Sequence, residues 1–213
     1  MKLIHFNEPA HTKKIEIKIS KQILKVKSDA ILFEFPKGSF GGIEKFNKYK
    51  PKNKPKYLIE NWKGNLLLSS KKINSLKGTI EIVKNIEKLW NNGHQIYLYN
   101  IDAPAELSKL GLYKRYSGKL SYNLRFWIWI FLREKIMISN IKKIYKNLKL
   151  KIKNPKLLVK CHNFHWRNIT FLLKNPDRKK IEHYYFSKFS RNEIKSVLMK
   201  EKVLRKWASD IYF

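Results

Sequence analysis

The sequence predicts an α/β protein with a mixed, largely parallel central sheet and helices on both faces. Short apolar runs alternate along the chain with longer segments in which apolar residues recur at helical spacing. An apolar strand, a helix and a second apolar strand form a βαβ unit, which requires parallel strands. The chain has 213 residues, 43% of them hydrophobic. This length and composition predict a single domain over residues 1–213 with a core of its own.

The first βαβ unit is predicted near the start of the chain. Residues 2–6 are expected to form a strand, residues 13–27 a helix with a lysine-covered outer face, and residues 30–36 a second strand. Residues 37–64 then lose this rhythm and are rich in glycine, proline and lysine. We expect an irregular lid or insertion there, with disorder as the alternative, and a short strand at residues 66–68.

The rest of the chain continues the alternation of helices and strands. Asn91-Asn92-Gly93 is a good stop signal for a helix that begins near Thr79. The patterns predict helices at 79–92, 120–150, 166–173 and 191–210, and strands at 95–99, 157–159 and, at a sheet edge, 183–189.

The chain is strongly basic, with 47 Lys and Arg against 16 Asp and Glu and a net charge of +31. This charge suits nucleic acid or another anionic surface. Most of it is lysine, whereas arginine is the residue suited to bidentate contacts with phosphates and bases. Lysine, isoleucine and asparagine together are also what an AT-rich coding sequence gives. Nucleic-acid binding is therefore kept as an alternative function.

A single cysteine, Cys161, excludes an internal disulfide and a cysteine-based zinc site. No signal peptide is apparent after Met1, so a cytoplasmic protein is expected. The most apolar run, 126–132, is far shorter than the roughly 20 residues of a membrane span. It is expected to be part of a buried helix, and a peripheral membrane contact through Trp127 and Trp129 is a further alternative.

Polar side chains follow four of the predicted strands. They are Glu8 with His11, Glu34, Asp102, and His162 with His165. Parallel strands bring their carboxyl ends to one edge of a sheet, where ligands bind, so we expect these groups to converge. Carboxylates and imidazoles without cysteine suit proton transfer or a metal site of oxygen and nitrogen ligands. The alternative is that the two histidines of the last junction cap the following helix or pack beneath it. The sequence contains no His-Glu-x-x-His, Gly-x-Ser-x-Gly or nucleotide-binding glycine loop.

Several of these segments, in this order, resemble one superfamily. It groups TraB/PrgY-type proteins, the TIKI proteases, erythromycin esterase and the haem-binding protein ChaN. The resemblance lies in five short motifs: Ile4 to His11, Asp29 to Glu34, Ile96 to Asp102, Arg133-Glu134 with Met137, and Leu158 to Leu173. Two glycines of the family pattern are replaced, by Glu8 and by His162. The chain therefore resembles a divergent member.

The resemblance implies an erythromycin-esterase/ChaN-like fold and a hydrolase that acts on an amide or ester bond of a peptide or ester substrate. His11 and His165 would bind a divalent metal ion or act as base, and Glu8 or Glu34 would complete the ligands or orient a histidine. Asp102 and Arg133 would support the site, Arg133 by pairing with a carboxylate or by stabilising an oxyanion. Known members include proteases, esterases and ligand-binding proteins, so the fold does not fix the chemistry.

Overall fold

A computed structural model describes residues 1–8, 13–34, 43–54, 56–70, 76–104, 107 and 119–200. The backbone contacts group the chain into two compact units. Unit 1 comprises residues 1–35, 39–100 and 142–163, and unit 2 comprises residues 36–38, 101–141 and 164–213. The single domain expected over residues 1–213 stays a prediction.

Unit 1 contains a four-stranded sheet with the order β1-β4-β2-β3, and all of its described strand pairs are parallel. The strands are β1 (Lys2–Glu8), β2 (Ala30–Phe33), β3 (Tyr97–Asn100) and β4 (Lys156–His162). Strand β2 and residues 157–159 of β4 are short apolar runs because both faces of a covered parallel sheet are buried, although β4 also contains the buried Lys160. The predicted α/β class and the largely parallel sheet are confirmed.

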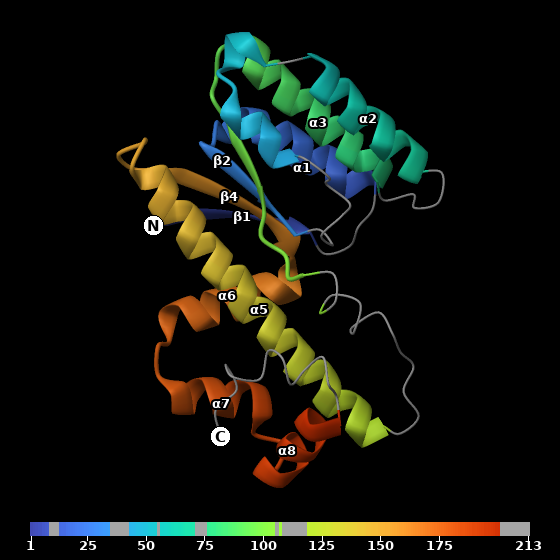
Figure 1. Cartoon of the computed structure of the whole chain (residues 1–213), viewed down its shortest axis with the longest axis vertical. Helices are drawn as coiled ribbons and strands as arrows, with labels where there is room; N and C mark the ends of the chain where they lie inside the picture. The colour runs from blue at the N-terminus through green and yellow to red at the C-terminus, as the bar shows by residue number, and fades with distance from the viewer. Residues whose placement is uncertain are drawn as a thin grey trace. The chain divides into compact units, whose positions relative to one another are not determined.

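Three helices cover one side of this sheet (Figure 1). They are α1 (Lys13–Val26), α2 (Lys56–Ser70) and α3 (Leu76–Asn91), and α3 contacts both others. Two short 3-10 helices, η1 (Ile43–Lys48) and η2 (Pro51–Asn53), precede α2. The core of unit 1 joins apolar residues of α1, α2, α3 and the sheet, including Ile23, Phe33, Trp62, Ile86 and Leu158.

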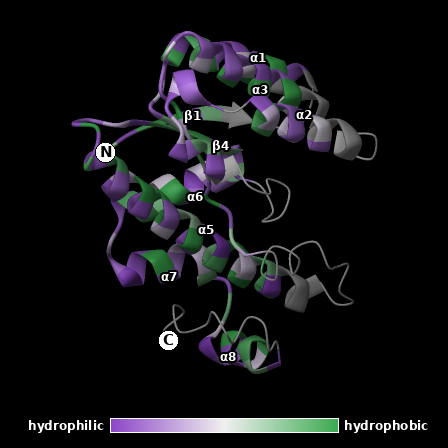
Figure 2. Cartoon of the chain, turned by 45° about the horizontal axis from the view of Figure 1, so that its top comes forward, coloured by the Kyte–Doolittle hydropathy of each residue, from purple (hydrophilic) through white to green (hydrophobic). Residues whose placement is uncertain are grey.

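Unit 2 is helical in its described part. The 31-residue helix α5 (Lys119–Lys149) contributes its residues up to Ile141, and α6 (Asn163–Lys174) contributes its residues from Phe164. The helices α7 (Arg178–Phe186) and α8 (Arg191–Lys200) complete it. Figure 2 shows hydrophobic and hydrophilic residues interleaved along α5. Its apolar side chains form a core with those of α7 and α8. Among the described residues, no helix is both long and apolar enough to cross a bilayer.

The aromatic run of α5 takes part in this core. Trp127 lies against Phe164 and Tyr185, and the indole N–H of Trp129 donates to the carbonyl oxygen of Leu107 at 2.6 Å. The run is therefore a partly buried helix segment, as the sequence predicts.

Two predicted strands are wrong. Residues 183–189 begin in α7, where the Asp177 side chain accepts hydrogen bonds from the backbone N–H groups of Lys179 and Lys180. This N-cap starts a helix that the β-favouring aromatics of the segment concealed. Residues 66–68 lie in α2, because a short apolar run does not by itself distinguish a strand from part of a helix.

The segment predicted to be irregular, residues 37–64, is largely helical where it is described. It contains η1, η2 and the first part of α2, while residues 37–42 and 55 lie outside the described part of the chain. A proline at the first position of a helix is tolerated, and Pro51 occupies such a position in η2. The other predicted helices and strands are confirmed, except that the closing helix is described only to Lys200 and residues 201–213 lie outside the description.

Candidate functional site

A buried cluster of polar side chains in unit 2 surrounds His165. His165 lies in the first turn of α6, directly after the end of β4. Arg133 and Glu134 are adjacent on α5, and Asp102 follows β3 by two residues. The side chains of Asp102 and Glu134 are fully buried, and those of Arg133 and His165 are 11% and 8% exposed. The structure thus brings together three residues that the sequence predicts for the site: Asp102, Arg133 and His165.

Both ring nitrogens of His165 have polar partners in this cluster. Its Nε2 lies 2.9 Å from Nη1 of Arg133, and its Nδ1 lies 2.8 Å from Oε1 of Glu134. A guanidinium can only donate, so Nε2 must accept the hydrogen bond from Arg133. The proton of a neutral imidazole then resides on Nδ1 and is donated to Glu134. The contacts therefore define one tautomer of His165.

The carboxylate of Glu134 accepts hydrogen bonds from two further side chains. Nδ2 of Asn168 donates to Oε1 at 2.8 Å, and the hydroxyl of Tyr185 donates to Oε2 at 2.6 Å. Tyr184 extends the network by donating to Oδ1 of Asn168 at 2.8 Å. Three donors that converge on one buried carboxylate compensate for the water it has lost.

Arg133 is held by a bidentate pair with Asp102. Its Nε donates to Oδ1 at 2.7 Å and its Nη2 donates to Oδ2 at 2.8 Å. The backbone N–H of Ala103 also donates to Oδ1, at 2.7 Å. The indole ring of Trp129 lies 5.3 Å from the guanidinium carbon. Such a fork fixes the plane of the guanidinium, so that Nη1 is directed at His165.

Burial dominates the ionisation of the central pair. It lowers the pKa of His165 below its usual 6.5, an effect that the positive charge of Arg133 reinforces and that Glu134 and Asp102 oppose. Burial raises the pKa of Glu134 above 4.5, and the hydrogen bonds from His165, Tyr185 and Asn168 oppose the rise. Burial beside Glu134 also raises the pKa of Tyr185, which keeps its hydroxyl a donor. His165 is accordingly neutral near pH 7.

The other predicted site residues lie in unit 1 or outside the described part. Glu34 follows β2, and its Oε2 accepts a hydrogen bond from the backbone N–H of His162 at 2.9 Å. Glu8 ends β1 in register with His162, but its side chain is not among those described. His11 lies outside the described residues. The carboxyl ends of β1, β2 and β4 therefore do bring Glu34 and the backbone of Glu8 and His162 to one edge of the sheet.

Three residues of the cluster were not predicted as part of the site: Asn168, Tyr184 and Tyr185. Glu134 was noted only as part of a motif. The sequence does contain a signal for Glu134, because it is the only acidic residue in α5 and lies between the buried Ile130 and Met137. Asn168 shares the face of His165, three residues away on α6. The sequence does not point to Tyr184 and Tyr185, because it predicts an edge strand for the segment that contains them.

The described residues of the cluster do not fit a metal ion. The lone pair of His165 Nε2 accepts from Arg133, and Nδ1 carries the proton, so neither nitrogen offers a lone pair for ligation. Among the described residues, no three His, Cys, Asp or Glu side chains are grouped so as to hold a metal. The predicted metal site of His11, His165 and Glu34 stays a prediction because His11 is not described, and it would require His165 Nε2 to release the hydrogen bond from Arg133.

No protein-family model matches this chain, and no curated protein or solved structure matches it either. The resemblance to TraB-type proteins therefore stays a prediction.

Proposed function

We propose that the protein is a hydrolase of an amide or ester bond, with His165 as its general base. The observation that supports this proposal is the chain of contacts from Glu134 through His165 to Arg133. A buried carboxylate on Nδ1 of a neutral histidine sets its tautomer and stabilises the imidazolium that forms when Nε2 takes a proton. Amide and ester hydrolysis both need such a base to activate water.

The charges of the cluster favour proton uptake during the reaction. Asp102 and Glu134 contribute two negative charges and Arg133 contributes one positive charge, so a neutral His165 leaves the cluster with one excess negative charge. Protonation of His165 in the transition state balances the buried charges. The lowered pKa keeps the imidazole deprotonated and able to accept the proton near pH 7.

Arg133 has two roles in this proposal. In the described state its Nη1 group occupies the lone pair of His165 Nε2. A carbonyl oxygen or carboxylate of the substrate would draw this N–H away, which frees Nε2 for water and places a donor where negative charge develops. Asp102 remains the anion paired with the guanidinium, and its two hydrogen bonds shift as Nη1 leaves His165 Nε2. Substrate binding and base activation are thereby coupled.

The experiment measures multiple-turnover hydrolysis of p-nitrophenyl acetate and of N-acetylated amino-acid p-nitroanilides. Multiple turnover is required because stoichiometric acylation of surface lysines would not count. We expect His165→Gln to lower kcat/KM by about 10²–10⁴-fold, the usual contribution of a general base. The matched control is His183→Gln, on the exposed surface of α7 in the same unit, which leaves kcat/KM unchanged.

A second variant keeps the proposal testable if His165→Gln is poorly folded. Arg133→Lys retains the positive charge but loses the fork, so kcat should fall with less loss of folded protein. Equal losses in His165→Gln and His183→Gln, or no turnover of either substrate class by the unmodified protein, would contradict the proposal.

A further inference from the structure

Seven exposed lysines follow one another along the chain in unit 1, where α5 ends and β4 begins. Residues 142–156 contain no acidic residue and no arginine. All seven lysines of this stretch are exposed, and we call them the lysine ridge: Lys142, Lys143, Lys146, Lys149, Lys151, Lys153 and Lys156. The ridge belongs to unit 1 and shares no residue with the cluster around His165, which belongs to unit 2.

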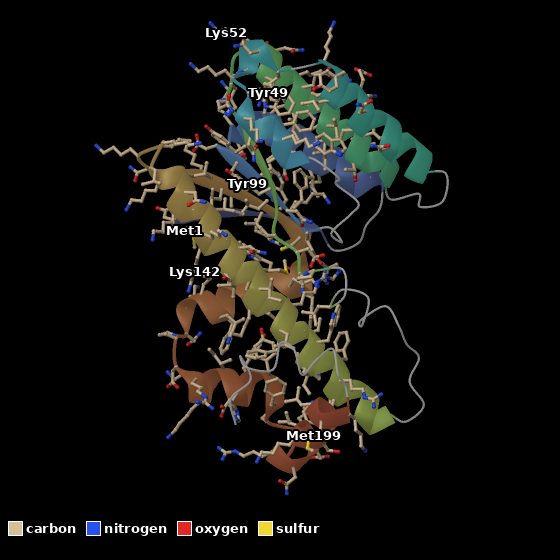
Figure 3. The ribbon with its side chains drawn as sticks, viewed as in Figure 1. Met1, Tyr49, Lys52, Tyr99, Lys142 and Met199 are labelled. Carbon is tan, nitrogen blue, oxygen red and sulfur yellow. The ribbon has the colours of Figure 1, made fainter. Side chains whose placement is uncertain are left out.

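Helical spacing aligns the first part of the ridge. Lys142, Lys146 and Lys149 lie at i, i+4 and i+7 on α5, so they share one face along roughly 10 Å of helix. The opposite face carries the buried Ile144 and Leu148, which anchor this end of the helix in unit 1. Figure 3 labels Lys142, the first residue of the ridge, on α5. These three lysines are therefore held in fixed positions on a packed helix.

The second part of the ridge follows the turn into β4. The backbone N–H groups of Lys151 and Ile152 both donate to the carbonyl oxygen of Leu148 at 2.9 Å, which ends the helix. The ammonium of Lys151 lies 5.5 Å from the ring centre of Tyr97. The backbone N–H of Lys156 donates to Asp29 at 2.7 Å, and Lys156 is in register with the exposed Lys2 of β1. The pairing of β4 with β1 thus fixes the position of Lys156 at the end of the lysine ridge.

Leu150 is the exposed apolar residue of this surface. It is 84% exposed, lies between Lys149 and Lys151 in the chain, and follows the helix on the side of Lys143 and Lys146 by helical spacing. A leucine side chain gains little from contact with the phosphate backbone of a nucleic acid, whereas a bilayer can bury it between the lipid headgroups. The absence of arginine also removes the side chain best suited to bidentate contacts with nucleic acid.

We propose that the lysine ridge with Leu150 docks unit 1 on a bilayer that contains anionic phospholipid. Clusters of four to eight basic residues on a helix are typical of contact with phosphatidylserine or phosphoinositides. The lysine stems cover the interface while their ammonium groups reach the phosphates. Leu150 enters the interface and adds an apolar contribution that salt does not screen.

The test is co-flotation of the full chain with two kinds of vesicle: phosphatidylcholine alone, and phosphatidylcholine mixed with phosphatidylserine. We expect binding to the mixed vesicles only. Changing Lys142, Lys146, Lys149 and Lys153 together to Gln should weaken it by on the order of a hundredfold or more, because each lysine contributes separately near an anionic surface. The matched control changes the exposed Lys179, Lys180, Lys188 and Lys195 of unit 2 to Gln, which removes the same charge and should have a much smaller effect.

Leu150→Ser separates a bilayer from a nucleic acid. It should weaken vesicle binding by about tenfold through loss of apolar burial and leave the affinity for a short duplex DNA unchanged. Equal losses in the two quadruple variants would assign binding to net charge and overturn the proposal. A ridge variant that loses only its affinity for the duplex, with vesicle binding intact, would overturn it in favour of a nucleic-acid surface.

Discussion

Two carboxylates follow strands of the same sheet, yet they are used differently. Glu34 comes directly after β2, is partly exposed, and accepts a hydrogen bond from the backbone N–H of His162. Asp102 follows β3, is fully buried, and forms a bidentate pair with Arg133. The first contact ties two strands of unit 1 together at their carboxyl ends. The second belongs to the cluster that reaches Glu134 through His165 in unit 2.

The difference shows that a carboxylate at a strand end does not by itself mark a site. A partly exposed carboxylate retains water and can accept one backbone donor at little cost. A fully buried one needs a cation or several donors, because the cost of desolvation is large. The buried pair of Asp102 and Arg133 fixes the orientation of the guanidinium. The guanidinium in turn sets the tautomer of His165, which determines the nitrogen that can accept a proton. Burial of a carboxylate beside a basic partner therefore indicates a functional site better than its position at a strand end does.

The largest expected effect is at Glu134. Glu134→Ala leaves the N–H of His165 Nδ1, the amide of Asn168 and the hydroxyl of Tyr185 without their buried acceptor. We expect the free energy of unfolding to fall by about 3–5 kcal/mol, measured by urea denaturation. The control is Glu182→Ala, which breaks an exposed pair with Arg178 and should cost about 0.5 kcal/mol or less. Similar losses of stability in both variants would contradict the view that three buried donors depend on Glu134 as their acceptor.

A direct comparison of the two strand ends should give the next largest effect. Asp102→Asn removes the charge that faces the buried fork of Arg133, and we expect a loss of about 2–4 kcal/mol. Glu34→Gln keeps an oxygen that accepts from His162, and Glu34 is not fully buried, so we expect a smaller loss than in Asp102→Asn. Thermal and urea unfolding of the two variants would measure the difference. Should Glu34→Gln cost as much as Asp102→Asn, the distinction drawn between the two ends would fail.

The smallest expected effect is the pH dependence that His165 contributes. Its pKa in the folded protein lies below the usual 6.5, so the unfolded chain takes up the proton first as the pH falls. The contribution of His165 to stability is therefore present above pH 6.5 and is lost as the pH falls toward the folded pKa. The stability difference between the unmodified protein and His165→Gln should shrink from pH 7.5 to pH 5.5. A difference that grows over this range would show the opposite shift.

Apolar periodicity and the residues that end helices and strands allowed much of the fold to be predicted. Strand β4 and helix α6 were placed around His162 and His165 because an apolar run, a junction and a helical spacing follow one another without interruption. The sequence predicts a strand at Tyr184 and Tyr185 because aromatic residues favour strands, whereas the N-cap at Asp177 begins a helix there. The sequence predicts only part of the site. Asp102 and His165 could be predicted because each follows a strand, whereas Tyr184 and Tyr185 could not, because their segment was expected to be a strand itself.

The sequence by itself determined the α/β class, the parallel sheet and the presence of Asp102, Arg133 and His165 in one functional hypothesis. The α/β class, the parallel sheet and the expected convergence of Asp102 with His165 follow from local periodicity and from the topology that parallel strands require, whereas Arg133 was implied only by the resemblance to TraB-type proteins. Only the tertiary structure decided which side chains meet: Glu134 with His165, Asn168 and Tyr185, and Asp102 with Arg133. Such contacts join residues tens of positions apart, and their existence depends on how the helices pack. No local pattern contains that information.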